Sequence, residues 1–269
     1  MKESSGYLDM EKASLYYSVR GSGSEVLLSF HGYGQSNKDF RVLDEVLHEK
    51  YTIYGFDLFF HGESFWHEKD KPLLKSFWKE LLSGFLKEHN IERFSVMGFS
   101  MGGKFALASL ESFPEKVDKL FLIAPDGIKI SFWYRLATEY PFMRKIFRGL
   151  ILKPWMYYGF MKKLQQFSLL NKKVLKFADS QLITREQRRR VYYSWVVFRK
   201  ISFAIGDIAL IINSHNIELE IFLGKYDKII TYNKVKKLLH KIRHPKLTIL
   251  NEGHSNLIRA VAAHYKKLS

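Results

Sequence analysis

The sequence contains no cysteine among its 269 residues. A chain without cysteine can have no disulfide framework, no thiolate nucleophile and no metal site built on cysteine ligands. Covalent catalysis, if the chain performs it, must therefore use a hydroxyl, an amine, an imidazole or a carboxylate.

Long apolar runs are also missing. The first residues, MKESSGYLDMEKASLYY, lack the apolar core of a signal peptide, and no run approaches the roughly 18 apolar residues that span a bilayer. We therefore expect a cytoplasmic protein. Hydrophobic residues make up 46% of the chain, which suits one large α/β domain or two small ones. The sequence does not indicate an oligomeric state.

Acidic residues are scarce relative to basic ones, so the formal net charge is +16, and aromatic residues make up 16% of the chain. This combination suits nucleic acid, an anionic membrane or an acidic ligand, depending on where the charge lies. Residues 128–213 contain 17 Lys and Arg but only 4 Asp and Glu, a net +13. Because this segment matches no nucleic-acid-binding module, nucleic acid is not expected as a partner.

Strand and helix patterns alternate outside this basic segment. The predicted strands cover residues 7–19, 25–30, 51–60, 91–97, 117–127, 217–224 and 246–250, with the first two forming a hairpin around GSGS at 21–24. Alternation of this kind predicts right-handed crossovers and an α/β fold, with a mostly parallel central sheet and helices on both faces. Ligands in such sheets bind at the carboxyl ends of the strands.

Residues 128–213 show helical stretches rich in aromatic, leucine and basic residues, and no strand alternation. We predict that they form a helical cap, or lid, inserted into a core made of residues 1–127 and 214–269. The composition of the cap favours a substrate with an apolar or anionic group, and also peripheral contact with an anionic membrane.

Residues 98–103, GFSMGG, lie between a predicted strand and a predicted helix. Gly-x-Ser-x-Gly in this context is typical of a nucleophile elbow, which holds Ser100 in a strained conformation above the sheet. Side chains at Gly98 or Gly102 would collide across the bend. The N–H of Met101, at the start of the helix, would then point toward an oxyanion.

Residues 31–34, HGYG, follow a second buried strand. Gly32 and Gly34 give this loop a backbone flexible enough to turn the N–H of Tyr33 into a pocket. An ordinary glycine turn explains the same four residues equally well.

Ser100 needs a base to remove its proton, and the base needs an acid to orient it. Asp227 and His254 each follow a predicted strand, at the same edge of the sheet as Ser100. Either alone has a structural explanation, since Asp227 can cap a helix and His254 can be a loop residue. Asp126 also lies at this edge of the sheet, and His61 is interpreted as part of a structural turn.

The chain resembles the α/β-hydrolase fold superfamily, in its single-domain form with a helical cap. The resemblance spans nearly the whole length outside 128–213, and it rests on HGYG at 31–34, DLFFHGES at 57–64, GFSMGG at 98–103, GKYDKII at 224–230 and NEGHSN at 251–256. It implies that Ser100 is the nucleophile, His254 the base and Asp227 the acid, with an oxyanion hole formed by the N–H groups of Tyr33 and Met101. Because some members supply the acid after the sixth strand, the resemblance also makes Asp126 a second candidate for the acid.

The residue at the elbow speaks against two kinds of relative, and one position departs from the family pattern. Haloalkane dehalogenases and epoxide hydrolases of this fold place Asp at the elbow, whereas this chain has Ser100. The family stretch usually reads Asp-x-x-Gly-His-Gly-x-Ser, and here Phe60 stands where the first Gly is common. We expect Phe60 to reshape the turn before His61.

The activity implied by the resemblance is that of a serine esterase, of carboxylesterase or lipase type, acting through an acyl-enzyme on a small ester. No metal ion or organic cofactor is implied. The same fold and triad also serve lyases, synthases and non-catalytic ligand receptors, so these remain alternatives.

Overall fold

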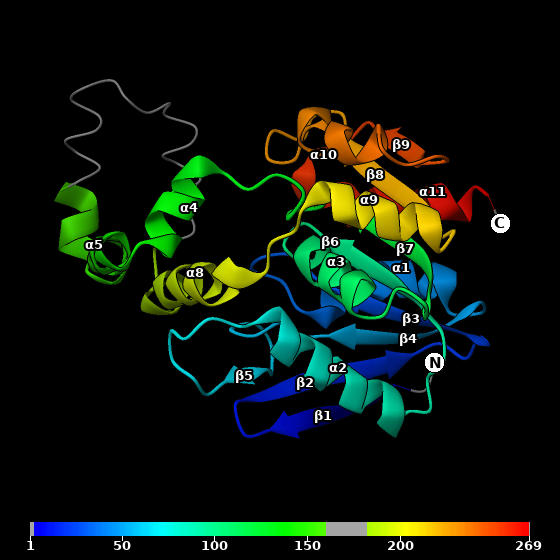
Figure 1. The fold of residues 1–269 in the computed structure, drawn as a ribbon, viewed down its shortest axis with the longest axis horizontal. Helices are drawn as coiled ribbons and strands as arrows, with labels where there is room; N and C mark the ends of the chain where they lie inside the picture. The colour runs from blue at the N-terminus through cyan, green and yellow to red at the C-terminus, as the bar shows by residue number, and fades with distance from the viewer. Residues whose placement is uncertain (1–2, 160–181, 269) are drawn as a thin grey trace. The chain divides into compact units, whose positions relative to one another are not determined.

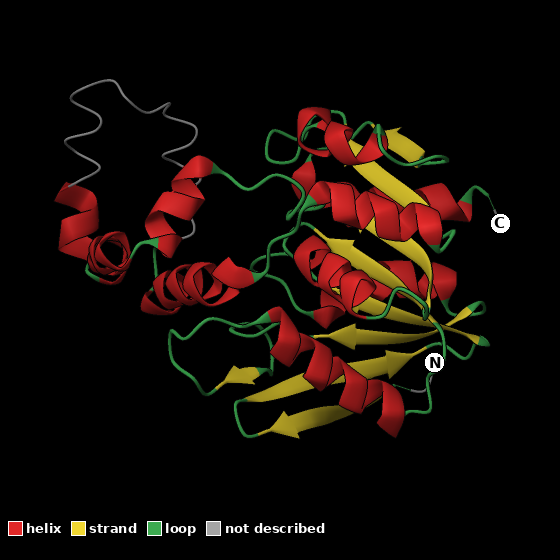
Figure 2. Ribbon diagram, viewed as in Figure 1, coloured by secondary structure: helices red, strands yellow, loops and turns green. Residues whose placement is uncertain are grey.

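The computed structural model describes residues 3–159 and 182–268, and it divides the chain into two units (Figure 1). The larger unit comprises residues 1–67, 74–129 and 201–269, and the smaller unit comprises residues 68–73 and 130–200. Figure 2 shows the strands in yellow, and the residue ranges of the described strands all fall within the larger unit.

A nine-stranded sheet organises the larger unit, in the order β1-β2-β4-β3-β6-β7-β8-β9, with β5 paired to β2. The strands are β1 (Ser4–Met10), β2 (Ala13–Arg20), β3 (Glu25–Phe30), β4 (Tyr51–Phe56), β5 (Phe65–Trp66), β6 (Phe94–Phe99), β7 (Val117–Ile123), β8 (Glu218–Gly224) and β9 (Lys246–Leu250). Neighbours from β4 to β9 run parallel, whereas β2 is antiparallel to β1, β4 and β5. The predicted mostly parallel sheet is thus confirmed.

Helices cover both faces of the sheet, as predicted. They are α1 (Arg41–Leu47), α2 (Lys75–Glu88), α3 (Gly102–Ser112), α9 (Ile205–Ser214), α10 (Tyr232–Leu239) and α11 (Leu257–Lys266), with 3-10 turns η1 (Asn37–Phe40) and η3 (His254–Asn256). In Figure 1, α2, α3 and α9 lie in front of the sheet and α1 and α11 behind it, consistent with the contacts of α1 with α11 and of α2 with α3. Helix α2 buries Trp78, Leu81 and Phe85, an i, i+3, i+7 pattern that presents one face to the sheet.

The predicted hairpin at the amino end is wrong. Residues 7–19 are not one strand: β1 and β2 pair with each other around a turn at Glu11 and Lys12. The GSGS segment at 21–24 leads to β3, which pairs with β4 and β6 rather than with β2. Glu-Lys carries none of the glycine or asparagine that marks a tight turn, so the true turn has no sequence signal.

The boundary predicted for the insertion also differs from that of the smaller unit. The prediction ended the insertion at residue 213, but α9 belongs to the larger unit, where Ile208, Ala209 and Ile212 are buried and the helix contacts α3 and α10. The smaller unit therefore ends at Lys200. Residues 160–181 of the predicted insertion lie outside the described residues.

The smaller unit has its own core. Its described helices are α4 (Phe132–Glu139), α5 (Pro141–Leu152) and α8 (Arg185–Val197), followed by the 3-10 turn η2 (Phe198–Lys200). Its buried cluster contains Ile151, Tyr157, Leu182, Tyr192 and Val196. Residues 68–73 join this unit because the N–H of Leu73 donates to the carbonyl of Val197 at 2.8 Å and the Tyr192 hydroxyl donates to Asp70 at 3.3 Å.

Among the helices of residues 3–159 and 182–268, none is both long enough and apolar enough to cross a bilayer.

Candidate active site

Ser100 occupies the sharp turn between β6 and α3. Its φ is +50°, in the left-handed region that costs a non-glycine residue about 1–2 kcal/mol. Three backbone hydrogen bonds hold this conformation: the Ser100 N–H donates to the carbonyl of Ile123 at 2.9 Å, and the Ser100 carbonyl accepts from Gly103 at 2.9 Å and Asp126 at 2.8 Å. The ends of β7 and α3 therefore fix the position of the serine.

Two glycines of the elbow have no room for a side chain. A Cβ atom built on Gly98 would lie 2.5 Å from the carbonyl oxygen of Gly102. A Cβ atom on Gly102 would lie 1.9 Å from the carbonyl oxygen of Phe30, at the end of β3. Both distances are far below van der Waals contact, so the bend and the approach of α3 to β3 both depend on glycine.

The side chains of Ser100, His254 and Asp227 form a chain of two hydrogen bonds. The Nε2 atom of His254 is 3.0 Å from the Oγ atom of Ser100, and Nδ1 is 2.6 Å from Oδ2 of Asp227. Because a carboxylate only accepts hydrogen bonds, Nδ1 carries the proton and Nε2 is left to accept from the serine hydroxyl. Loops after β6, β8 and β9 supply the three residues.

The carboxylate of Asp227 is buried, and the backbone holds it in place. Its Oδ1 atom accepts hydrogen bonds from the N–H groups of Ile229 at 2.7 Å and Ile230 at 2.9 Å. Burial alone would raise the pKa of Asp227, but the hydrogen bonds from His254 and from the two N–H groups outweigh it, so the pKa lies below its usual value. Asp227 therefore remains ionised at neutral pH.

Asp126, the second candidate for the acid, makes different contacts. Its Oδ2 atom is 3.2 Å from Nζ of the buried Lys104, and its Oδ1 atom accepts a hydrogen bond from the N–H of Gly127 at 2.8 Å. The sequence pattern did not indicate this ion pair, although Lys104 directly follows the elbow glycines. Of the two carboxylates, Asp227 is the one that contacts His254.

The HGYG loop is held by the side chain of its own histidine. The Nε2 atom of His31 accepts a hydrogen bond from the N–H of Leu58 at 2.9 Å, and Nδ1 donates to the carbonyl of Gly32 at 2.7 Å. The N–H of Gly32 in turn donates to the side chain of Gln35 at 3.0 Å. Gly34 has a φ of +77°, which glycine adopts without strain. His31 was not singled out by the sequence analysis.

The HGYG loop and the elbow are in backbone contact. A Cβ atom on Gly102 would lie 2.8 Å from the carbonyl oxygen of His31, two residues before Tyr33. Met101 directly precedes α3, so its N–H lies at the amino end of that helix. The two candidate oxyanion donors, the N–H groups of Tyr33 and Met101, thus belong to adjoining backbone segments.

Phe99 is another residue that the sequence analysis did not identify. Its ring lies 5.0 Å from the imidazole of His254, centroid to centroid, and a Cβ atom on Gly32 would be 2.7 Å from its Cδ1 atom. The side chain therefore packs against both the base and the HGYG loop. Its position directly before the serine is the only signal that could have indicated this role.

His61 is buried and makes the structural contacts expected of a turn residue. Its Nδ1 atom donates to the carbonyl of Phe59 at 3.0 Å, and its ring lies 5.3 Å from His31 and 5.4 Å from Tyr33. These contacts support the HGYG loop from the side of β4.

Phe60 lies in the turn before His61, where the sequence departs from the family pattern. Its φ is +70°, so it takes the left-handed conformation that glycine adopts freely. The neighbouring Phe59 is buried, and its ring lies 5.3 Å from that of Trp66. The departure from the family pattern thus places a strained phenylalanine on a glycine-type backbone.

We expect Phe60→Gly to be more stable than Phe60→Ala by about 0.5–1 kcal/mol in urea unfolding. Both variants remove the ring, but only alanine keeps the left-handed strain. Phe59, which is not among the residues of positive φ, is the matched control, and there alanine should be the more stable replacement. Equal or greater stability of Phe60→Ala would contradict the strain.

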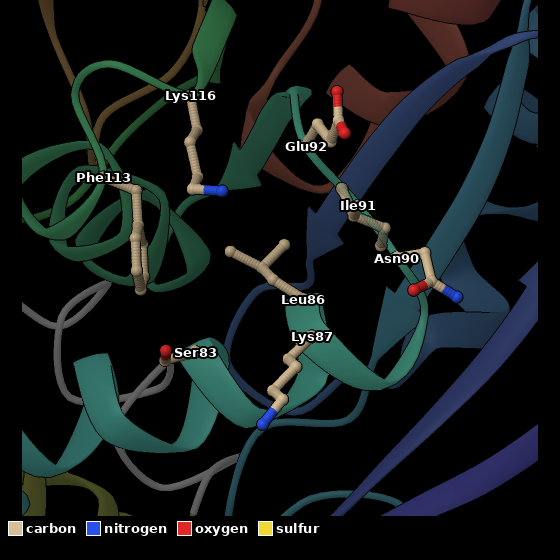
Figure 3. A pocket seen from close by; sticks show the side chains of 8 residues that line it. All are labelled: Ser83, Leu86, Lys87, Asn90, Ile91, Glu92, Phe113 and Lys116. Carbon is tan, nitrogen blue, oxygen red and sulfur yellow. The ribbon is translucent and has the colours of Figure 1, made fainter.

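A surface hollow of the larger unit lies at the opposite end of β6 from Ser100 (Figure 3). Ile91 and Glu92 line it just before the strand begins. Strand β6 then runs for six residues, roughly 20 Å, and Ser100 follows its last residue. The remaining lining residues are Ser83, Leu86, Lys87, Asn90, Phe113 and Lys116. The hollow is therefore not part of the candidate site.

Comparisons with known proteins show the family and the fold. A sequence profile of the alpha/beta hydrolase fold matches residues 25–181. An uncharacterized protein of Mycobacterium tuberculosis is 30% identical over 127 residues, which are 45% of this chain and 36% of that protein, so the match spans about a third of the relative's length.

Two crystal structures from Bacillus subtilis show the same fold. Naproxen esterase superposes with a TM-score of 0.65 at 14% identity, covering 99% of this chain and 90% of that one. Carboxylesterase CesB superposes with a TM-score of 0.64 at 13% identity, covering 100% of this chain and 90% of that one. At these identities the similarity concerns the fold alone.

Proposed function

Because the chain belongs to the alpha/beta hydrolase fold family, we propose that it is a serine hydrolase that cleaves carboxylic esters. The observation that carries the proposal is the hydrogen-bond chain from Ser100 Oγ through His254 to Asp227, with lengths of 3.0 and 2.6 Å. A nucleophile, a base and an orienting acid within hydrogen-bond reach are the arrangement that acyl transfer requires.

In the first half-reaction, His254 Nε2 takes the hydroxyl proton of Ser100 while Oγ attacks the ester carbonyl. Ionised Asp227 stabilises the positive imidazolium that forms. The N–H groups of Tyr33 and Met101 donate to the oxyanion, and each such donor typically contributes a factor of about 10²–10³ in rate. His254 then protonates the leaving alcohol, which leaves an acyl group on Ser100.

In the second half-reaction, His254 Nε2 removes a proton from water, whose oxygen attacks the acyl carbonyl of the ester on Ser100. The same two N–H groups stabilise the second oxyanion. The carboxylic acid departs as Ser100 regains its proton from His254. The cycle balances with one ester and one water consumed and one alcohol and one acid released.

The substrate class is an ester with an apolar acyl or aryl group. The apolar residues Phe99 and Met101 on either side of Ser100, which give the serine apolar surroundings, support it. The aromatic Tyr33 lies in the HGYG loop beside them. A net charge of +16 also favours an anionic group on the substrate, through long-range attraction.

A fluorophosphonate probe and a panel of p-nitrophenyl esters, from acetate to laurate, test the proposal together. We expect the probe to modify Ser100, as located by peptide mass spectrometry, and we expect hydrolysis to improve with acyl chain length before it falls. Absence of the adduct would contradict a serine hydrolase. An adduct without ester hydrolysis would instead indicate a lyase or synthase that uses the same residues.

A further inference from the structure

The smaller unit exposes large apolar side chains on two adjoining helices. Phe132, Trp133 and Tyr140 lie on or next to α4, and Phe142 and Ile146 lie on α5. The side chains of Phe132, Trp133 and Phe142 are 69%, 73% and 68% exposed, although aromatic rings are usually buried. We call these five residues the aromatic face.

The five residues lie close together along the chain, and some of them are in contact. The rings of Phe132 and Trp133 touch, with centroids 5.5 Å apart. Phe132 and Tyr140 line one shallow hollow along α4. Tyr140 and Phe142 flank Pro141 at the corner between the helices, and Ile146 stands one turn beyond Phe142 on α5. The five residues are therefore neighbours along α4, the corner at Pro141 and the first turns of α5.

The aromatic face is not the packing surface of the smaller unit. Helix α5 contacts α8 through its opposite side, where Phe147 and Ile151 join the buried cluster. The Phe147 ring stacks on that of Trp195 at 5.4 Å. Among the described residues of the unit, the buried cluster does not include the five exposed residues, and exposed apolar side chains that gather in this way often mark an interaction site.

Cations interleave with the aromatic face. Arg135 lines the same hollow as Phe132 and Tyr140, and Lys145 and Arg148 are exposed one turn apart beside Phe142 and Ile146. Residues 130–200 contain 16 Lys and Arg and 3 Asp and Glu, so this unit carries a net +13 of the chain's +16. Glu139, the one acidic residue in 130–159, is ion-paired with Lys200 at 2.8 Å.

We propose that the aromatic face docks on the surface of an anionic lipid bilayer. Phenylalanine, tryptophan and tyrosine rings insert at the headgroup level, and lysine and arginine beside them attract acidic lipids. The exposed rings suit the headgroup region of a bilayer, and the positive charge of the unit is complementary to acidic lipids.

Co-sedimentation with vesicles tests the docking without turnover, so its result is separate from the proposed hydrolysis. The full chain should bind vesicles of phosphatidylcholine with 30% phosphatidylglycerol at least tenfold more tightly than pure phosphatidylcholine vesicles. Raising the salt from about 50 to 300 mM should remove most of this difference, because salt screens surface charge. Equal binding to both vesicles, or binding to neither, would overturn the proposal.

Two triple variants separate the rings from the charges. Phe132→Ser, Trp133→Ser and Phe142→Ser together should weaken binding to the anionic vesicles by tenfold or more. Arg135→Gln, Lys145→Gln and Arg148→Gln together should weaken it by roughly 100-fold, at about fivefold for each cation. Circular dichroism and the thermal unfolding midpoint establish that each variant is folded.

Matched controls lie in the larger unit. Leu210→Ser removes a side chain on α9 that is 68% exposed, and Lys87→Gln, Lys236→Gln and Lys237→Gln remove three exposed cations. These controls should bind within about threefold of the unmodified chain. A control charge variant that binds as weakly as the Arg135, Lys145 and Arg148 variant would show a general charge effect and overturn the assignment to this face.

Discussion

Ser100→Ala should lower kcat for p-nitrophenyl ester hydrolysis by about 10⁴–10⁶-fold. The proposed nucleophile is lost, while the HGYG loop, the elbow backbone and His254 remain, so any residual rate comes from binding and the oxyanion donors. The unfolding free energy should change by no more than about 1 kcal/mol, because alanine keeps the same left-handed backbone and loses one half-exposed hydrogen bond.

The control for this variant is Ser112→Ala. Ser112 is at the far end of α3, where its hydroxyl donates to the carbonyl of Ala108 at 2.7 Å. This variant should keep kcat within about twofold. If Ser100→Ala retained more than a hundredth of the original kcat, in a preparation free of contaminating esterase, the assignment of Ser100 as nucleophile would fail.

Asp227→Asn should lower kcat by about 10³–10⁴-fold with little change in KM. The amide is neutral, so it does not stabilise the imidazolium, and its NH₂ group can hold His254 in the wrong tautomer. The expected measurement is a Michaelis–Menten analysis on one short ester, at a pH where the unmodified chain is fully active.

The stability of this variant should depend on pH with a defined sign. The pKa of Asp227 is lower in the folded chain than in the unfolded chain, so its ionised form stabilises the fold above about pH 4. That contribution is lost as the pH falls through the folded-state pKa. The difference in unfolding free energy between the two proteins should therefore shrink on acidification below about pH 4.

Asp126→Asn is the matched control, because Asp126 pairs with Lys104 and not with His254. Its carboxylate is half-buried, and its backbone N–H, which donates to Ser100, is unchanged by the substitution. We expect kcat to stay within about threefold. A larger loss at Asp126 than at Asp227 would reverse the assignment of the acid.

The parts of the site that sequence reasoning located are those whose chemistry requires a particular residue at a strand end. Ser100, Asp227 and His254 each follow a strand, and parallel strands bring their carboxyl ends to one edge. Gly98 and Gly102 were identifiable because the bend excludes a Cβ atom, a constraint that leaves a direct mark on the sequence.

Features that arise from packing left no such mark. Phe99 contacts His254 and the HGYG loop, but in the sequence it cannot be distinguished from a phenylalanine that only fills the core. The turn at Glu11 and Lys12 has no turn residues, and α9 follows the helices of the insertion with no strand pattern between them, although it packs in the larger unit. Each depends on tertiary contacts that periodicity and propensity do not encode.

The left-handed backbone of Ser100 affects which substitutions at this position stabilise the fold. Glycine would relieve about 1 kcal/mol of strain there, so the simplest stabilising substitution at the elbow is also one that removes the hydroxyl. Selection for stability alone would therefore favour a protein that lacks the proposed nucleophile. A lineage that keeps serine at this position is one in which selection for its chemistry has outweighed that gain.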